Sequence, residues 1–506
     1  MNPSKRIFVN TILQYARSII NTLLSLYTVP IVLNALGADD YGVYTLVAGV
    51  VAMLGFVTNA MVITTQRHLS FYYGKKDVQK VRIYFSNSFL LHLCMAFFLV
   101  VVFVSLRGFL FSGYLEIAEE RREIASWVYM MVIAMLVLTF ISAPFKALFI
   151  AKENIWYITA VDVFDGILKF VLAITLLQLN VDKLLMYGVM MLIIMLVQFL
   201  AYSVYSVIRF AECQPTRIFK DVGKTYMLQL VNFAGWTTYG MGAVMVRTQG
   251  LSVLFNKMLC ETAVNAAYGI GLQLYSAVSF ISSSVQNAIN PQIMQSEGQG
   301  DRKRMFNLAA QESKFVSCMM AILFIPLCFE MDRVLDAWLQ DVPSYAPVFC
   351  RCFLLTFLAD QLTYGLNAAN QAIGKIRCYT LMMYTPKLLV IPVAWYMLRQ
   401  GSSVFEVMTV YVVVELLVAI MRLPYMHYAG GLCVVDFCKK VFFRLFPLFI
   451  CLTAVSCALS YTSSHWWRFF FTIPVSVLVG IVVAWKIVLS DSERQKITNI
   501  IKKKVK

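Results

Sequence analysis

The stretch NTILQYARSIINTLLSLYTVPIVLN, residues 10–34, combines a long apolar run with a row of polar side chains. About 20 apolar residues cross the hydrocarbon core of a bilayer as a helix, so this stretch predicts a transmembrane helix. Asn10, Gln14, Arg17 and Asn21 recur at helical spacing and therefore share one face of that helix. A charge inside a membrane span is costly unless it meets water or a partner, which makes Arg17 a candidate functional residue.

The composition extends this prediction to the whole chain. Of its 506 residues, 60% are hydrophobic and 14% are charged, which excludes an ordinary soluble domain. Apolar runs of membrane-spanning length lie at about 10–34, 41–65, 84–106, 125–150, 158–178, 185–208, 228–256, 264–289, 315–331, 348–370, 379–398, 405–428, 441–460 and 469–489. We predict an all-α polytopic membrane protein with about 14 transmembrane helices.

Basic residues are concentrated in alternate loops. If the N-terminus is cytoplasmic, the inside segments hold 27 of the 43 Lys and Arg residues and the outside segments hold 8. Because cytoplasmic loops retain Lys and Arg, both termini are predicted to be cytoplasmic. The net charge of +16 then reflects topology, and we expect no nucleic-acid partner. The Lys502-Lys503-Lys504 tail is expected to be attracted to anionic headgroups.

The 12 cysteines and four histidines predict neither a disulfide framework nor a metal site. Most of the cysteines fall in apolar runs, where a free thiol behaves as a small hydrophobic side chain. None of them combines with histidine at metal-ligand spacing. We therefore expect no cofactor, and only H⁺ or Na⁺ as a coupling ion.

Short sequence matches recur in the same order in the two halves of the chain. Val9-Asn10 returns as Val231-Asn232, and Gly74-Lys75-Lys76-Asp77 resembles Gly300-Asp301-Arg302-Lys303. Several such pairs are separated by nearly the same offset along the chain. Transporters are often built from internal repeats, so this recurring offset predicts two related halves.

Six predicted spans separate each pair of equivalent positions, an even number that gives both halves the same orientation. We predict an N-lobe at residues 1–215 and a C-lobe at 216–430, facing each other across a central cavity. Two further helices occupy 431–490, and a basic cytoplasmic tail occupies 491–506.

The segment Leu36-Gly37-Ala38-Asp39-Asp40-Tyr41-Gly42, followed by Arg67-His68-Leu69 and Gly74-Lys75-Lys76-Asp77, carries a family resemblance. It resembles the oligosaccharide flippases of polysaccharide biosynthesis. These are the O-antigen and capsule translocases of the multidrug/oligosaccharidyl-lipid/polysaccharide (MOP) exporter superfamily. The strongest motif is confined to the N-terminal part of the chain and ends at Asp77.

The resemblance implies a MATE-like V of two six-helix bundles followed by two C-terminal helices. It also implies that undecaprenyl-pyrophosphate-linked oligosaccharide is moved across a bacterial inner membrane by alternating access. We expect the chain to work as a monomer, with membrane lipids and polysaccharide polymerase machinery as its other partners.

Such a lipid carries an anionic pyrophosphate, whose passage requires fixed positive charge and hydrogen-bond donors in a water-filled cavity. The intramembrane cations Arg17, Arg247, Lys169 and Lys387 are candidates to supply that charge. The alternative is that each arginine snorkels to the interface or pairs with a buried carboxylate.

Other polar residues in the spans are candidates to line the cavity. They are Asn10, Gln14, Asn21, Asn232, Tyr239, Asp360, Tyr364 and Asn367. Hydrogen bonds between packed helices would produce the same pattern.

Three carboxylates, Asp162, Asp165 and Glu415, are candidates for ion coupling. Asp165 lies four residues before Lys169, so an ion pair within one helix is the alternative there. For Glu415 the alternative partner is Arg422, seven residues further along the same face.

Two other functions fit part of the sequence. A cation-coupled multidrug exporter of the same superfamily shares the predicted architecture, but exporters of cationic drugs favour acidic cavities rather than paired arginines. A polyprenyl-dependent membrane enzyme is the second alternative. The predicted loops reach only about 25 residues, too short for a catalytic domain, and no nucleophile and base occur at interpretable spacing. We therefore predict that the chain is not an enzyme.

Overall fold

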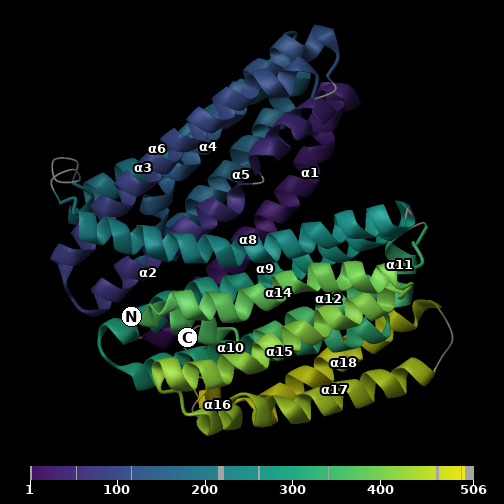
Figure 1. Cartoon of the computed structure of the whole chain (residues 1–506). Coiled ribbons are helices and arrows are strands. Elements are labelled where there is room, and N and C mark those ends of the chain that lie inside the picture. The colour runs from purple at the N-terminus through teal and green to yellow at the C-terminus, as the bar shows by residue number, and fades with distance from the viewer. Residues whose placement is uncertain are drawn as a thin grey trace. The chain divides into compact units, whose positions relative to one another are not determined.

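The computed structural model of the chain is a set of helices joined by short turns (Figure 1). It describes residues 3–52, 54–114, 117–214, 221–259, 262–339, 341–462, 466–491, 493–495 and 498. This described part contains no strand, and the all-α prediction is confirmed. The predicted Lys502–Lys504 tail lies outside the described residues.

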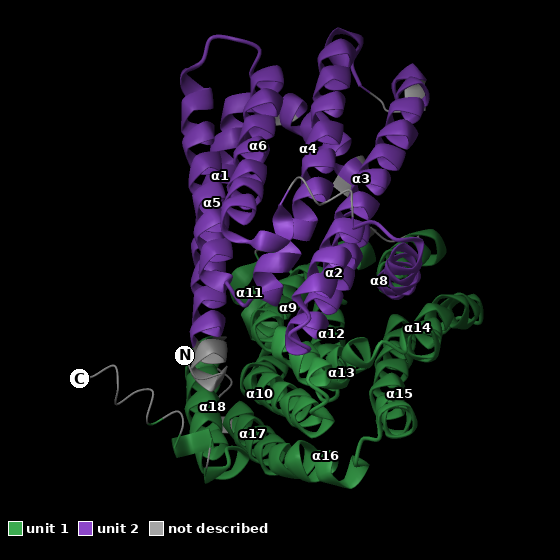
Figure 2. Ribbon diagram, turned by 90° about the vertical axis from the view of Figure 1, so that its left-hand side faces the viewer, with its two compact units in different colours: residues 1–5, 242–506 green, residues 6–241 purple. Residues whose placement is uncertain are grey.

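The chain divides into two compact units (Figure 2). We call residues 6–241 the N-terminal unit, and residues 1–5 with 242–506 the C-terminal unit. The boundary falls within one helix, α8 (Lys224–Leu259), whose first part belongs to the N-terminal unit and whose second part belongs to the C-terminal unit.

In the described residues, six α-helices precede α8. They are α1 (Pro3–Ala52), α2 (Gly55–Gly74), α3 (Val78–Phe109), α4 (Glu119–Ala151), α5 (Ile155–Gln178) and α6 (Lys183–Arg209). Within α1 the backbone kinks at Gly37 (φ 80°, ψ 166°), between the predicted spans 10–34 and 41–65. The predicted span 41–65 is wrong as a single helix, because α1 ends at Ala52 and α2 begins at Gly55. The apolar pattern continues through that break, so hydropathy alone did not reveal it.

The C-terminal unit contains the remaining helices. They are α9 (Thr262–Gly298), α10 (Arg302–Phe329), α11 (Met331–Trp338), α12 (Ala346–Gln361), α13 (Gly365–Ile373), α14 (Ile376–Arg399), α15 (Val404–Gly430), α16 (Val434–Lys440), α17 (Phe442–Thr462) and α18 (Phe469–Val483). The predicted span 348–370 is two helices, α12 and α13, bent by 46°. The predicted spans 264–289 and 315–331 leave residues 290–314 as a loop, which is wrong, because only a short turn separates α9 from α10. Charged residues ended the apolar pattern there without ending the helix.

Nine helices in the described residues are long and apolar enough to cross a membrane, or ten if α12 and α13 form one bent span. These helices identify a multi-pass membrane protein. Among the fourteen predicted spans, those over α2, α5, α8 and α9 are not in this set. Helix α5 is outside the set because it carries three charged side chains, Asp162, Asp165 and Lys169. The charges that make α5 a candidate for function therefore also lower its hydropathy.

The turn before α3 has the same construction as the turn before α10. Lys76 (φ 59°) and Gly300 (φ 78°) each adopt a left-handed conformation. The next residues, Asp77 and Asp301, cap the following helices by accepting a hydrogen bond from a backbone N–H three residues later, at 3.0 and 2.9 Å. The offset between these turns is close to the offsets of the sequence matches, but it aligns Asp77 with Asp301, whereas the sequence match aligned Gly74 with Gly300.

A second pair of turns repeats the pattern. Glu153 (φ 56°) precedes Asn154 at the start of α5, and Gly374 (φ 88°) precedes Lys375 at the start of α14. The offset between these turns is nearly the same as that between the first pair, so the two halves share turn geometry even where the residue types differ. Left-handed conformations are rare outside glycine, which makes their recurrence informative.

The two C-terminal helices pack against α10. A Cβ atom on Gly480 of α18 would lie 3.0 Å from side-chain atoms of both Ile322 on α10 and Leu452 on α17, so a larger residue there would require these side chains to shift. Just before α18, Arg468 donates two hydrogen bonds, at 2.9 and 3.1 Å, to the fully buried carboxylate of Glu330 at the end of α10. A bidentate arginine contact of this kind fixes both distance and orientation.

Candidate functional site

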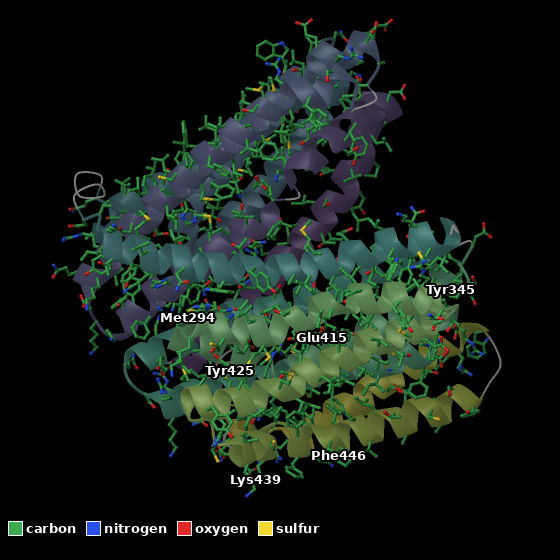
Figure 3. All side chains as sticks on the ribbon, in the orientation of Figure 1. Met294, Tyr345, Glu415, Tyr425, Lys439 and Phe446 are labelled. Carbon is green, nitrogen blue, oxygen red and sulfur yellow. The ribbon has the colours of Figure 1, made fainter. Side chains whose placement is uncertain are left out.

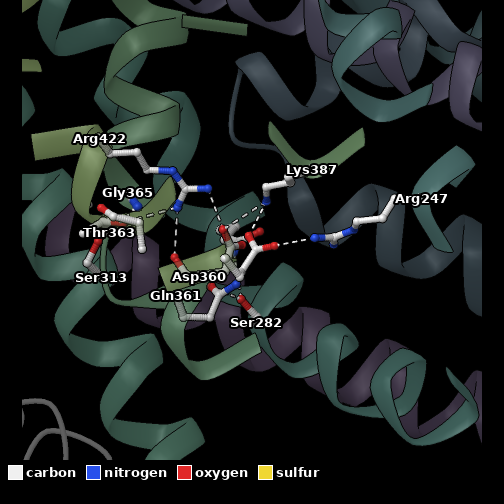
Figure 4. A network of polar contacts seen from close by, with 12 residues as sticks. Arg247, Ser282, Ser313, Asp360, Gln361, Thr363, Gly365, Lys387 and Arg422 are labelled. Atoms are coloured by element: carbon white, nitrogen blue, oxygen red, sulfur yellow. Dashed lines mark hydrogen bonds and ion pairs between the residues drawn. The ribbon is translucent and has the colours of Figure 1, made fainter. Parts of the chain in front are cut away.

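Five charged side chains form a buried group in the C-terminal unit (Figure 4). Arg247 comes from α8, Asp360 from α12, Lys387 from α14, and Glu415 and Arg422 from α15. We call these residues the Glu415 cluster. Four of the five were singled out from the sequence on separate helices, and the structure brings them together.

Glu415 lies between two cations. One of its oxygens, Oε2, accepts a hydrogen bond from Arg247 Nη1 at 2.7 Å, and the other accepts one from Lys387 Nζ. The side chains of Arg247, Lys387 and Glu415 are 4%, 5% and 2% exposed. At this burial an unpaired charge is strongly unfavourable, so each of the three depends on its partners.

Arg422 is held at the bend between α12 and α13. Its Nη2 donates to Asp360 Oδ1 at 2.5 Å, and its Nη1 donates to the Asp360 carbonyl at 3.0 Å and to Thr363 Oγ1 at 3.3 Å. The expected pairing of Glu415 with Arg422 is therefore not formed, because Arg422 pairs with Asp360 instead. Lys387 lies 3.8 Å from Asp360 Oδ1 and connects the two carboxylates.

Tyrosine rings surround the cations of the cluster. The Arg247 guanidinium lies 4.1 Å from the ring centroid of Tyr411, and the Arg422 guanidinium lies 5.8 Å from that of Tyr364. Ring faces attract cations, more strongly where water is excluded. Tyr364, predicted to line a cavity, thus contacts an arginine of the cluster.

The Glu415 cluster carries an excess of positive charge, because its three cations face two carboxylates. Arg247 Nε and Arg422 Nε have no hydrogen-bond partner in the described residues. The cluster therefore retains both charge and donor capacity beyond what its own carboxylates take up.

A second charged group lies in the N-terminal unit. Arg17 Nη1 of α1 is 2.7 Å from Asp162 Oδ2 of α5, and Lys146 Nζ of α4 is 3.5 Å from the same oxygen. The other oxygen, Oδ1, accepts hydrogen bonds from Tyr202 at 2.9 Å and Gln198 at 3.5 Å, both on α6. We call these five residues the Asp162 cluster. Two cations face one carboxylate, so it too has a positive excess.

The cations of the Asp162 cluster are more accessible than those of the Glu415 cluster. The Arg17 side chain is 17% exposed and that of Lys146 is 36% exposed. Further along α5, Lys169 Nζ donates to Asp165 Oδ2 at 2.7 Å. The ion pair expected from their spacing is therefore confirmed.

The polar face of the first helix lies against its neighbours in the N-terminal unit. Asn10 and Gln14 are buried, and Asn10 Nδ2 donates to the Glu153 carbonyl at 3.4 Å. Asn21 Oδ1 lies 2.8 Å from the position of a Cβ on Gly166, so Asn21 packs on α5. Gln14 Oε1 and Asn21 Oδ1 have no hydrogen-bond partner in the described residues.

The remaining predicted lining residues lie apart from the clusters' ion pairs. Asn232 is exposed and accepts a hydrogen bond from Trp236 Nε1 of its own helix at 3.0 Å. The Tyr239 ring is 6.1 Å from that of Trp236. Asn367 is buried on α13, seven residues after Asp360.

Sequence reasoning missed Lys146, Gln198 and Tyr202. Lys146 was detectable, because it is a cation within a predicted span and follows Pro144 closely. Tyr202 could not be predicted, because nothing in the sequence distinguishes it from the other tyrosines among the 26 in the chain.

The fold is that of known MATE transporters. No family model and no curated protein matches this sequence. A MATE structure in the bent conformation matches with a TM-score of 0.73 at 13% identity, over 87% of this chain and 97% of that one. An outward-facing multidrug resistance MATE family transporter of the MOP superfamily matches with a TM-score of 0.69 at 13% identity, over 87% and 97%.

A MOP superfamily transporter from Pyrococcus furiosus is also similar. It matches with a TM-score of 0.69 at 13% identity, over 84% of this chain and 95% of that one. It is described as having a binding pocket of reverse polarity that suggests a different function. At these identities the matches establish a MATE-like fold, as the family resemblance implied.

Proposed function

We propose that this protein is a transporter that moves undecaprenyl-pyrophosphate-linked oligosaccharide across a bacterial inner membrane by alternating access, with both termini cytoplasmic. The observation that carries the proposal is the positive excess in the membrane-spanning part of each unit. The Asp162 cluster has two cations for one carboxylate, and the Glu415 cluster has three for two. Such sites favour an anionic substrate.

The Asp162 cluster is the better candidate for direct contact with pyrophosphate. Its Arg17 and Lys146 side chains are partly exposed, whereas Arg247 and Lys387 are almost fully buried. A guanidinium fork binds phosphate oxygens bidentately, and a lysine adds a point charge. In this proposal the Arg17 fork leaves Asp162 to bind the substrate, and Asp162 is the candidate for ion coupling.

The runner-up is a cation-coupled multidrug exporter, which is favoured by the description of one similar structure as a multidrug resistance transporter. A cationic drug requires acceptor groups that are not already taken by protein cations. Here Asp162, Asp360 and Glu415 each contact at least one Lys or Arg. The reverse polarity described for the Pyrococcus furiosus protein supports the idea that this fold serves substrates of more than one charge.

Transport by the purified protein tests the proposal. In proteoliposomes, the native chain is expected to move a pyrophosphate-linked polyprenyl oligosaccharide to the opposite leaflet. Arg17→Ala removes the fork and neutralises the Asp162 cluster, so the initial rate should fall at least about tenfold, equivalent to roughly 1.4 kcal/mol. Arg17→Lys keeps the charge without the fork and should give an intermediate rate.

Arg399→Ala is the matched control. It removes one exposed arginine at the end of α14, outside both clusters, and should transport at the native rate. Export of a lipophilic cationic dye without glycolipid movement would instead favour the multidrug exporter. Full glycolipid transport by Arg17→Ala would show that Arg17 is only a structural partner of Asp162.

A further inference from the structure

The C-terminal unit contains a basic crevice that is separate from the Glu415 cluster. Two cavities, of about 830 and 320 Å³, share Asn307 and Ala310 of α10 and Lys440 of α16 in their linings. The larger opens between α10 and the turn after α15, and the smaller lies between α10, α17 and the segment after α18. We call the two together the basic crevice.

The crevice lies where membrane-spanning helices end. α10 begins at Arg302, α15 ends at Gly430 and α17 begins at Phe442, and all three are long and apolar enough to cross a membrane. Because these termini meet at one end of the unit, the crevice is at the level where helices leave the hydrocarbon. Lipid headgroups occupy that level.

Cations dominate the lining, and some of them are already neutralised. Lys314 Nζ contacts both oxygens of Glu493 at 2.7 Å. Burial raises the pKa of Glu493, but hydrogen bonds from Lys314 and from the Ser490 N–H lower it further than burial raises it. Glu493 therefore stays ionised and offsets Lys314. Lys440 is similarly paired with Asp436 at 2.6 Å.

Within the part of the chain that the structure describes, two of the lining cations have no carboxylate partner. The Lys303 side chain has no hydrogen-bond or ion-pair partner in the described part of the chain. Arg444 makes its hydrogen bond to a backbone carbonyl, that of Val488, at 3.4 Å. A third lining residue, Arg302, is paired with Glu297, which does not line either cavity. The crevice therefore presents unneutralised positive charge from α10 and from α17.

The same region is also apolar. Phe306, Leu432 and Phe437 line the larger cavity beside the cations. The outer surfaces of α16 and α17 expose Val435 and Phe446, each 62% exposed, and Figure 3 shows Phe446 projecting from the outside of the unit. A lipid acyl chain would bury apolar area against such a surface, whereas a soluble anion would not.

We propose that the basic crevice binds the headgroup of an anionic phospholipid, with its acyl chains along the exposed apolar face of α16 and α17. Lys303 in the larger cavity and Arg444 in the smaller one supply the positive charge that holds the headgroup, and the lipid thereby connects α10 to the two C-terminal helices. Basic pockets between membrane helices are known to take anionic headgroups. The site is independent of the transported substrate.

Native mass spectrometry of the full-length protein in detergent tests this proposal. Phosphatidylglycerol is titrated against phosphatidylcholine with the same acyl chains, and the native chain should bind the anionic lipid more tightly. Each cation contributes about fivefold in affinity, so Lys303→Ala should weaken phosphatidylglycerol binding about fivefold and Lys303→Ala/Arg444→Ala about 30-fold.

Lys439→Ala is the control, because Lys439 is an exposed lysine of α16 that lines neither cavity and projects outward in Figure 3. It should bind phosphatidylglycerol like the native chain. The exposed Lys303 is removable without loss of packing, so the single variant tests the site even if the double variant unfolds.

Three results would overturn the proposal. Equal binding of the two lipids, or equal loss in Lys303→Ala and Lys439→Ala, would show that the crevice does not recognise the headgroup. Displacement of the lipid by millimolar inorganic phosphate would indicate a soluble-anion site. Strong preference for a polyprenyl pyrophosphate over phosphatidylglycerol would reassign the crevice to the transport substrate.

Discussion

Replacement of Glu415 by glutamine is expected to destabilise the C-terminal unit by about 3–5 kcal/mol. Glutamine keeps the shape of the side chain but removes the charge that balances Arg247 and Lys387, which are 4% and 5% exposed. Removing one partner of a buried ion pair leaves an uncompensated charge in a medium of low dielectric constant. Thermal denaturation of the purified protein in detergent should show a large fall in melting temperature.

The effect of Glu415→Gln should be specific to its position. Glu406→Gln lies on the same helix but is exposed at its start, where the glutamine oxygen can still accept the Ser403 N–H, so its effect should stay within about 0.5 kcal/mol. Arg247→Ala should be milder than Glu415→Gln, because Lys387 still pairs with the carboxylate. Equal melting temperatures for the Glu415 and Glu406 variants would contradict a structural role for this cluster.

The membrane class and the candidate charges were predictable because both depend on local sequence. A charge within an apolar run is visible without a structure, and so is a pair four residues apart, such as Asp165 and Lys169. The partners of Arg17 and Arg247 were not predictable. They lie 145 and 168 residues away, on helices whose packing is decided by surface shape rather than by spacing along the chain.

Helix ends were predicted less well than helix cores, for a physical reason. Hydropathy reports where a chain is apolar, whereas a helix continues through charged residues until a cap or a turn ends it. The stretch 290–314 was therefore expected to be a loop, although α9 reaches Gly298 and α10 begins at Arg302. Because of that error, Lys314 was assigned to a loop rather than to α10, and the basic crevice that it lines was not predicted. The helix ends lie beside left-handed turns at Lys76 and Gly300, which a hydropathy pattern does not record.

Gly365→Ala is expected to destabilise the C-terminal unit by at least about 1–3 kcal/mol, the usual range for overpacking. A Cβ on Gly365 would lie 2.1 Å from the carbonyl oxygen of Ala309 on α10, and 3.0 Å from Ser313 Oγ. A backbone carbonyl cannot rotate away as a side chain can, so α13 must move. The movement should also break the hydrogen bond from the Gly365 N–H to Ser313 Oγ, now 3.0 Å long.

The melting temperature measures the stability loss of Gly365→Ala, and the rate of glycolipid transport measures the effect of this substitution on the Glu415 cluster. Gly365 follows the bend at which Arg422 bonds to Asp360, so displacement of α13 should disturb the Glu415 cluster without changing any of its charges. Gly269→Ala in α9 is the control, since nothing lies within 4 Å of its Cβ position and alanine is the better helix former. If both variants melt like the native protein, α10 and α13 do not approach as closely as the structure indicates, and the bend at Asp360 must be held by Arg422 alone.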